Sequence, residues 1–146
     1  MQHFAGWDSA VTSRFLQKAE VGVKGARMPL EAGDTDGACS RAYYAMYDAA
    51  RATLDWAGIT PESSGFKTRR GLIAAFSMHL VKPGLFPAQP GRAIQRAQTV
   101  RLVADYEAEP VPHDDAVETV AKAEAFVSTA AALLATSFQG PSASAP

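Results

Sequence analysis

The stretch that decides the fold is residues 38–56, ACSRAYYAMYDAARATLDW, which contains neither Gly nor Pro. At about 100° per residue, small side chains and a final tryptophan form one stripe along it, spaced four and three residues apart in turn. The stripe consists of Ala38, Ala42, Ala45, Ala49, Ala52 and Trp56. A bulkier apolar side is formed by Cys39, Tyr43, Met46, Tyr47, Ala50 and Leu54. Alanine at this spacing lets a second helix approach closely. The segment is therefore predicted to be a central helix that is apolar on two sides.

Turn residues divide the rest of the chain into further helices. Gly and Pro cluster at 33, 58–65, 83–91 and 110–112, and the segments between are too long and Ala-rich for strands. Five helices are expected, over 9–32, 34–56, 67–81, 92–107 and 114–138. Asp8 is a candidate N-cap for the first helix, and Pro29 should kink that helix or end it early.

Short connections between long helices favour neighbours that run in opposite directions. The predicted fold class is therefore all-α, an up-and-down antiparallel bundle of four to five helices. A length of 146 residues favours a single domain. We expect this domain to cover 1–138, followed by a disordered C-terminal tail over 139–146 that has nothing to bury.

Several functional classes are disfavoured by composition. The first eight residues lack a basic region followed by an apolar run, so no signal peptide is expected, and no apolar stretch is long enough to cross a bilayer. Cys39 is the only cysteine, which excludes an internal disulfide and a cysteine-clustered zinc site. We therefore expect a cytoplasmic protein with no membrane partner, no bound metal and no cofactor.

The charge of the chain is unevenly distributed. The net charge is −1, yet no acidic residue lies between Glu62 and Asp105. That basic window carries seven cations, namely Lys67, Arg69, Arg70, Lys82, Arg92, Arg96 and Arg101. Such asymmetry suggests a face that meets an anion, most often phosphate. The alternative is a solvated basic surface that pairs with the acidic helices.

Arg41 and Asp48 stand seven residues apart, so they share one face of the central helix, about 20° apart and beside the alanine stripe. A charged side chain beside a closely packed helix contact needs either an oppositely charged partner or a water-filled cleft. One interpretation is a structural salt bridge between the two, joined by Arg101 and Asp105. The other is a polar cleft at a helix–helix or dimer seam that receives a phosphate.

Residues 40–50, SRAYYAMYDAA, resemble the second-helix signature of HEPN proteins, in which an Arg-Ala-Tyr-Tyr-Ala stretch leads to a polar or His position. Other segments resemble the family in the same order. They are FLQKAE at 15–20, LEAGD at 30–34, GLIAAF at 71–76, VKPG at 81–84 and RLVADY at 101–106. The resemblance covers about 15–132.

This resemblance implies a helical bundle that commonly dimerises. Many family members are metal-independent ribonucleases of toxin–antitoxin, phage-defence and CRISPR systems, and many are encoded beside a minimal nucleotidyltransferase. Their catalytic pattern is an Arg followed, after four to six residues, by a His. The His moves protons while the RNA 2′-OH attacks its own phosphate, and the Arg steadies the developing charge.

Arg41 matches the catalytic Arg of the family, but position 48 holds Asp in place of His. None of His3, His79 and His113 has an Arg five to seven positions before it. The candidate catalytic residues are therefore Arg41 and Asp48, and the resemblance implies an RNA-acting protein whose cleavage is attenuated. Two alternatives remain: a non-catalytic module that presents substrate to a nucleotidyltransferase, and a helical adaptor that binds another protein through the alanine stripe.

The candidate binding residues lie on three predicted helices. They are Tyr44, Arg69, Arg70, Arg92, Arg96, Arg101, Asp105 and Tyr106. Arg101 and Asp105 are expected to pair inside the bundle, while Arg92 and Arg96 on the opposite side remain available to an anion such as RNA. A homodimer is expected because the central helix has more apolar surface than one small bundle can cover.

Overall fold

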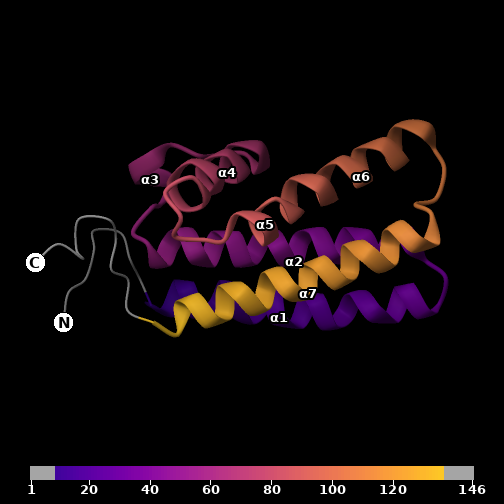
Figure 1. The fold of residues 1–146 in the computed structure, drawn as a ribbon, viewed down its shortest axis with the longest axis horizontal. Helices are drawn as coiled ribbons and strands as arrows, with labels where there is room; N and C mark the ends of the chain where they lie inside the picture. Colours follow the sequence, from indigo (N-terminus) through magenta and orange to yellow (C-terminus); the bar gives the residue numbers. More distant parts are fainter. Residues whose placement is uncertain (1–8, 137–146) are drawn as a thin grey trace, which may run out of the picture.

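The computed structural model describes residues 9–136, and all regular structure within that range is helical. The helices are α1 (Ser9–Glu31), α2 (Thr35–Trp56), α3 (Pro61–Ser64), α4 (Arg69–Phe76), a π-helical turn (Ser77–Val81), α5 (Ala88–Gly91), α6 (Ala93–Glu107) and α7 (His113–Leu134). The chain direction alternates through α1, α2, α6 and α7, with α6 oblique to the rest (Figure 1). The predicted all-α, up-and-down bundle is confirmed.

The α1–α2 pair is the frame of the bundle. Gly33 ends α1 with φ +85°, and the Asp34 carboxylate caps α2 by accepting the Gly37 N–H at 2.9 Å. Midway along the pair, a Cβ added to Gly22 would lie only 3.3 Å from the Cβ of Ala45. The alanine stripe therefore brings a neighbouring helix close, as predicted. Near the other end, the Thr12 hydroxyl donates to the buried Asp55 carboxylate at 2.6 Å.

The core is closed by α7 and by aromatic side chains. Phe76, Phe86 and Phe126 are buried, with ring centroids 4.9–5.5 Å apart. The connection between α6 and α7 is tied to α2, because the Val111 N–H donates to the Asp36 carboxylate at 2.9 Å. This tether keeps α7 on the α1–α2 pair although α6 intervenes in sequence.

Several helix limits differ from the sequence prediction. Pro29 neither ends α1 early nor interrupts it, because it lies in the last turn, where the loss of one hydrogen bond is tolerated. The first Gly/Pro-rich connection contains a helical turn, α3, with Thr60 and Ser63 capping each other and Pro61 at the first position. A second turn, α5, lies in the 83–91 connection, and α7 ends at Leu134, short of 138. The expectations for Asp8 and for the 139–146 tail lie outside the described residues.

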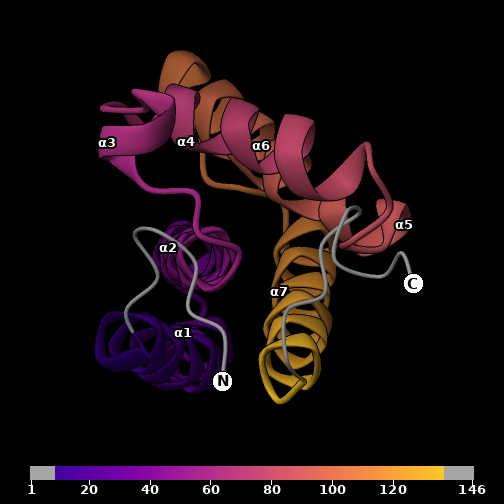
Figure 2. The ribbon, with the colours of Figure 1, turned by 90° about the vertical axis from the view of Figure 1, so that its left-hand side faces the viewer.

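The sides of α2 are covered unequally. Figure 2 shows α1 on one side of α2, α7 on a second, and the layer of α3, α4 and α6 on a third. No helix of the described range covers the fourth side (Figure 2). Beyond its first turns, α2 has five residues that are half-buried or exposed, and their three- and four-residue spacing places them on one side of the helix. They are Arg41, Tyr44, Tyr47, Asp48 and Arg51. The candidate catalytic positions therefore lie on the open side of the central helix.

Candidate functional site

Arg41 lies at the border between α2 and α1. Its side chain is exposed, and a Cβ added to Gly25 of α1 would lie 3.4 Å from its Nη1 atom. The absence of a side chain at Gly25 thus leaves room for the guanidinium to rest along α1. Arg41 is held near the surface, where it can meet an anion.

Asp48 lies two turns further along the same edge of α2 and is half-buried. It borders a hollow of about 390 Å³ whose other lining residues are Arg14, Gln17, Lys18, Val21 and Gly22 of α1. Burial raises the pKa of the Asp48 carboxyl, and the positive charge of Lys18 acts in the opposite direction. The carboxyl therefore holds a proton more readily than an ordinary Asp does.

Arg41 and Asp48 are not joined. The ion pairs within residues 9–136 are Arg27–Glu124 and Arg96–Glu118. The structural salt bridge proposed for Arg41 and Asp48 is therefore wrong. Since each side chain lies against α1, neither turns along α2 toward the other.

A tyrosine–arginine cluster, consisting of Tyr43, Tyr44, Arg69 and Arg101, lies where α2, α4 and α6 meet. The Arg69 guanidinium lies 4.9 Å from the Tyr44 ring centroid, and that of Arg101 lies 5.1 Å from Tyr43 and 5.4 Å from Tyr44. The two rings meet edge to face at 5.2 Å. Burial raises the pKa of the Tyr43 hydroxyl, with Arg101 and then Arg69 opposing it. Cations stacked on aromatic faces are groups that bind phosphates and unstacked bases.

Arg51 is a candidate site residue that the sequence analysis missed. Its guanidinium lies 4.8 Å from the Phe15 ring and 5.8 Å from the Phe66 ring, and its buried Nε has no hydrogen-bond partner. It follows Asp48 by three residues and Tyr44 by seven, which places it on the same side of α2. That spacing was visible in the sequence. The convergence of two phenylalanines from distant segments was not.

The remaining predicted site residues lie apart from this cluster. Arg70 is exposed beside Arg69 at the start of α4. Asp105 and Tyr106 are exposed, Tyr106 at 91%, because the last turns of α6 extend away from the α1–α2 pair (Figure 1). The prediction that Arg101 and Asp105 pair inside the bundle is wrong, since Arg101 turns to the tyrosines and Asp105 to solvent.

Arg92 and Arg96 lie on the side of α6 opposite Arg101, where they line a separate hollow next to α7. The structure thus brings together Tyr44, Arg69 and Arg101, places Arg41 and Asp48 on the same side of α2, and keeps Arg92 and Arg96 away from both. Within residues 9–136, no group of three or more His, Cys, Asp or Glu is arranged to hold a metal ion. No helix of that range has the length and apolar character needed to cross a membrane.

Comparison with known proteins agrees with this architecture. The HEPN domain family model matches residues 12–133, and the chain belongs to that family. It is 31% identical over 91 residues to a UPF0332 protein of Gloeobacter violaceus, covering 62% of this chain and 68% of the relative. It is 29% identical over 112 residues to a Methanocaldococcus jannaschii protein named "Putative toxin", covering 77% of this chain and 80% of that protein.

Proposed function

We propose that this chain is the HEPN component of a toxin–antitoxin or phage-defence pair, and that the open side of α2 acts on RNA. The observation that carries the proposal is the position of Arg41, which matches the family's catalytic Arg and is exposed and unpaired with Asp48. The toxin-like name of the M. jannaschii relative supports the same role. An arginine paired inside the bundle would be unable to serve a phosphate.

The chemistry of the site favours slow cleavage. Arg41 can steady the charge that develops on the phosphate, and the tyrosine–arginine cluster can hold neighbouring nucleotides. Asp48 stands where the family His moves protons. Its raised pKa makes it a better proton acceptor than an ordinary carboxylate. The unperturbed pKa of a carboxyl group, about 3.9 for Asp, nevertheless lies well below that of imidazole, about 6.5. We therefore propose an attenuated, metal-independent endoribonuclease that needs no cofactor.

The active form is proposed to be a homodimer that uses the α1–α2 edge. Val21 and Met28 of α1 are 71% and 73% exposed and stand seven residues apart, so they share a face of that helix. Val21 borders the Asp48 hollow. A second copy seated here would cover both apolar side chains and bring two Arg41/Asp48 sets to one seam. Sedimentation at micromolar concentration should show the dimer, and a Val21→Asp/Met28→Asp variant should be monomeric.

A minimal nucleotidyltransferase is the proposed partner protein, and the cytoplasm the proposed compartment. The Asp at position 48 favours one alternative, in which the chain is a non-catalytic module that presents substrate to that partner. Both roles predict RNA binding at the open side of α2. The two roles differ in whether a variant of the purified chain can cleave RNA.

The decisive experiment is cleavage of labelled RNA, with a chelator present, by wild type and two variants. Wild type should cleave weakly. Asp48→His should gain activity, because general acid–base catalysis typically contributes about 10²- to 10⁴-fold. Arg41→Ala/Asp48→His should lose that gain, since the phosphate has no anchor. Arg27→Ala/Asp48→His is the matched control, because Arg27 is an exposed α1 arginine that binds Glu124.

Strong wild-type cleavage that disappears in Arg41→Ala would overturn the attenuation and make Asp48 a working catalytic residue. RNA binding without cleavage by Asp48→His would favour the presenting module. Absence of both RNA binding and cleavage would contradict an RNA-acting role altogether.

A further inference from the structure

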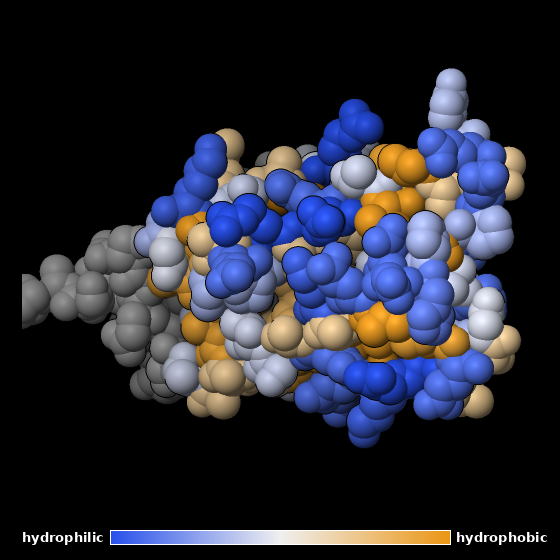
Figure 3. Space-filling view, turned by 45° about the vertical axis from the view of Figure 1, so that its right-hand side comes forward, coloured by the Kyte–Doolittle hydropathy of each residue, from blue (hydrophilic) through white to orange (hydrophobic). Residues whose placement is uncertain are grey.

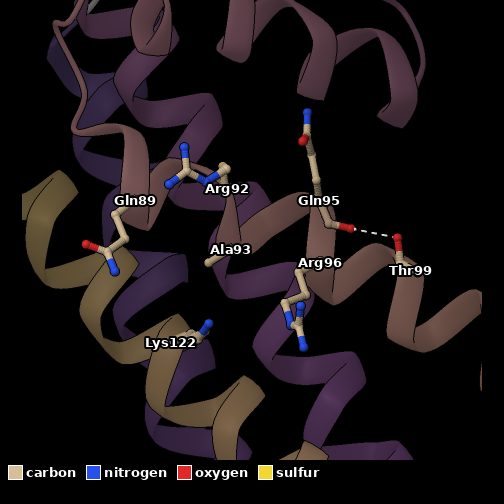
Figure 4. Close-up of a pocket in the computed structure, with 7 residues that line it drawn as sticks. All are labelled: Gln89, Arg92, Ala93, Gln95, Arg96, Thr99 and Lys122. Carbon is tan, nitrogen blue, oxygen red and sulfur yellow. Dashed lines mark hydrogen bonds between the residues drawn. The ribbon is translucent and has the colours of Figure 1, made fainter.

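A second basic hollow lies between α5, α6 and α7, on the side of α6 that faces away from the tyrosine–arginine cluster. It measures about 530 Å³, and we call it the α5–α7 pocket. Its lining residues are Gln89, Arg92, Ala93, Gln95, Arg96, Thr99 and Lys122. In Figure 4 the side chains of Gln89 and Arg92, from the α5–α6 junction, and of Lys122, from α7, lie around the small Ala93.

The lining of the pocket is cationic. Arg92, Arg96 and Lys122 contribute three positive charges, and none of the lining residues is acidic. Glu118 supplies a counter-charge beside the pocket, since its carboxylate lies 3.8 Å from Arg96 Nε, with both side chains at least half exposed. An exposed pair at that distance contributes little. Three like charges gathered around one hollow repel one another, and a bound anion relieves this repulsion.

The neutral lining residues complement the charges. Gln89 and Gln95 carry amide groups that both donate and accept hydrogen bonds. The Thr99 hydroxyl is already engaged, since it donates to the backbone carbonyl of Gln95 at 3.1 Å. Ala93, only 7% exposed, leaves space above the helix surface that a larger side chain would fill. The hollow is thus polar, open, and sized for a phosphate group with part of the molecule that carries it.

The α5–α7 pocket offers little apolar surface to a ligand. On the face shown in Figure 3, hydrophobic residues form separate patches divided by hydrophilic ones. The pocket itself has Ala93 as its only apolar lining residue. A cationic hollow with amide groups favours an anion over an apolar ligand.

We propose that the α5–α7 pocket is a phosphate-binding site for a nucleotide, held by Arg92, Arg96 and Lys122. The phosphate could belong to an RNA backbone or to a free nucleotide, since both present the same oxygen atoms. The site goes beyond the proposed function, because it lies on the opposite side of α6 from Arg101 and includes neither Arg41 nor Asp48. Binding here requires no cleavage at α2.

The test measures binding of inorganic phosphate, ATP and a labelled oligoribonucleotide to the full chain. The pocket variant is Arg92→Gln/Lys122→Gln. The matched control is Lys67→Gln/Lys82→Gln, which removes the same charge from exposed positions outside the pocket. The pocket variant should bind at least about tenfold more weakly than wild type, while the affinity of the control variant should stay within about twofold of wild type. The NMR signals of the Gln89 and Gln95 side-chain amides should shift on binding in wild type.

The three ligands identify the source of the phosphate. Saturable ATP binding lost in the pocket variant supports a free nucleotide, and oligoribonucleotide binding alone supports an RNA backbone. Equal losses in the pocket and control variants, or unshifted glutamine signals, would overturn the proposal. Repeating the titration with Arg41→Ala separates the two sites, since the pocket should bind as before even if the α2 side has no activity.

Discussion

Arg96 and Arg101 stand five residues apart on α6, yet their guanidinium groups lie in different surroundings. Arg101 is half-buried and lies about 5 Å from two tyrosine rings, whereas the Arg96 side chain is 68% exposed beside the α5–α7 pocket. A stacked arginine is held in one orientation before a ligand arrives. An exposed arginine can adapt to the ligand but loses more conformational freedom on binding. The same basic window therefore supplies arginines to the preorganised tyrosine–arginine cluster and to the more adaptable α5–α7 pocket.

The largest expected effect is on stability, and it tests whether the tyrosine–arginine cluster depends on the close contact between α1 and α2. Ala45→Leu should lower the free energy of unfolding by about 1–3 kcal/mol through overpacking, because Gly22 leaves no room for a larger side chain. It should also weaken RNA binding at the α2 side while leaving phosphate binding in the pocket intact. Urea denaturation and both titrations provide the measurement. Ala125→Leu on the exposed surface of α7 is the control, and equal stability of the two variants would mean that the stripe is loosely packed.

The next effect compares the two kinds of arginine directly. Arg101→Lys keeps the charge but loses the planar group that stacks on Tyr43 and Tyr44, so RNA affinity should fall by about fivefold, or about 1 kcal/mol. Arg92→Lys should change affinity by less than about twofold, since an exposed pocket mainly needs charge. Fluorescence anisotropy with one oligoribonucleotide measures both. Similar losses in the two variants would remove the distinction between cluster and pocket.

A smaller effect concerns salt. If RNA contacts the pocket through two arginines, Arg92→Gln/Arg96→Gln should reduce the slope of log affinity against log salt concentration by about 1.4. Arg101→Ala should reduce it by about half as much, because it removes one contact. Titrations at several salt concentrations give the slopes. An unchanged slope in the double variant would place the RNA outside the pocket.

The smallest effect concerns Asp48 and pH. Its pKa in the folded protein lies above the ordinary value of 3.8, so ionisation costs more in the folded than in the unfolded state. The stability of wild type relative to Asp48→Asn should therefore decline as pH rises from about 3.8 through the raised pKa, and stay lower at neutral pH. Denaturation of both proteins between acid and neutral pH tests this. Curves that remain parallel would contradict the raised pKa.

Much of the architecture was predictable because it depends on local chemistry. The absence of Gly and Pro from 38–56 and the alanine spacing predicted α2 and the close approach of a neighbour, which Gly22 provides. The basic window and its division between two faces of α6 followed from helical periodicity. The helical turns α3 and α5 were missed. In α3 the mutual capping of Thr60 and Ser63 turns a Gly/Pro-rich connection into a short helix, whereas α5 has no such side-chain cap.

The sequence by itself determined which residues share a helix face, since that depends only on 3.6 residues per turn. It placed Arg41 and Asp48 together on α2 and set Arg92 and Arg96 opposite Arg101. Only the tertiary structure decided their partners, since these come from residues distant along the chain. Arg101 lies on tyrosines of α2 instead of beside Asp105, and Lys122 of α7 completes the pocket. Arg51 lies near phenylalanines 36 residues before it and 15 after it, and no helical periodicity encodes such a contact.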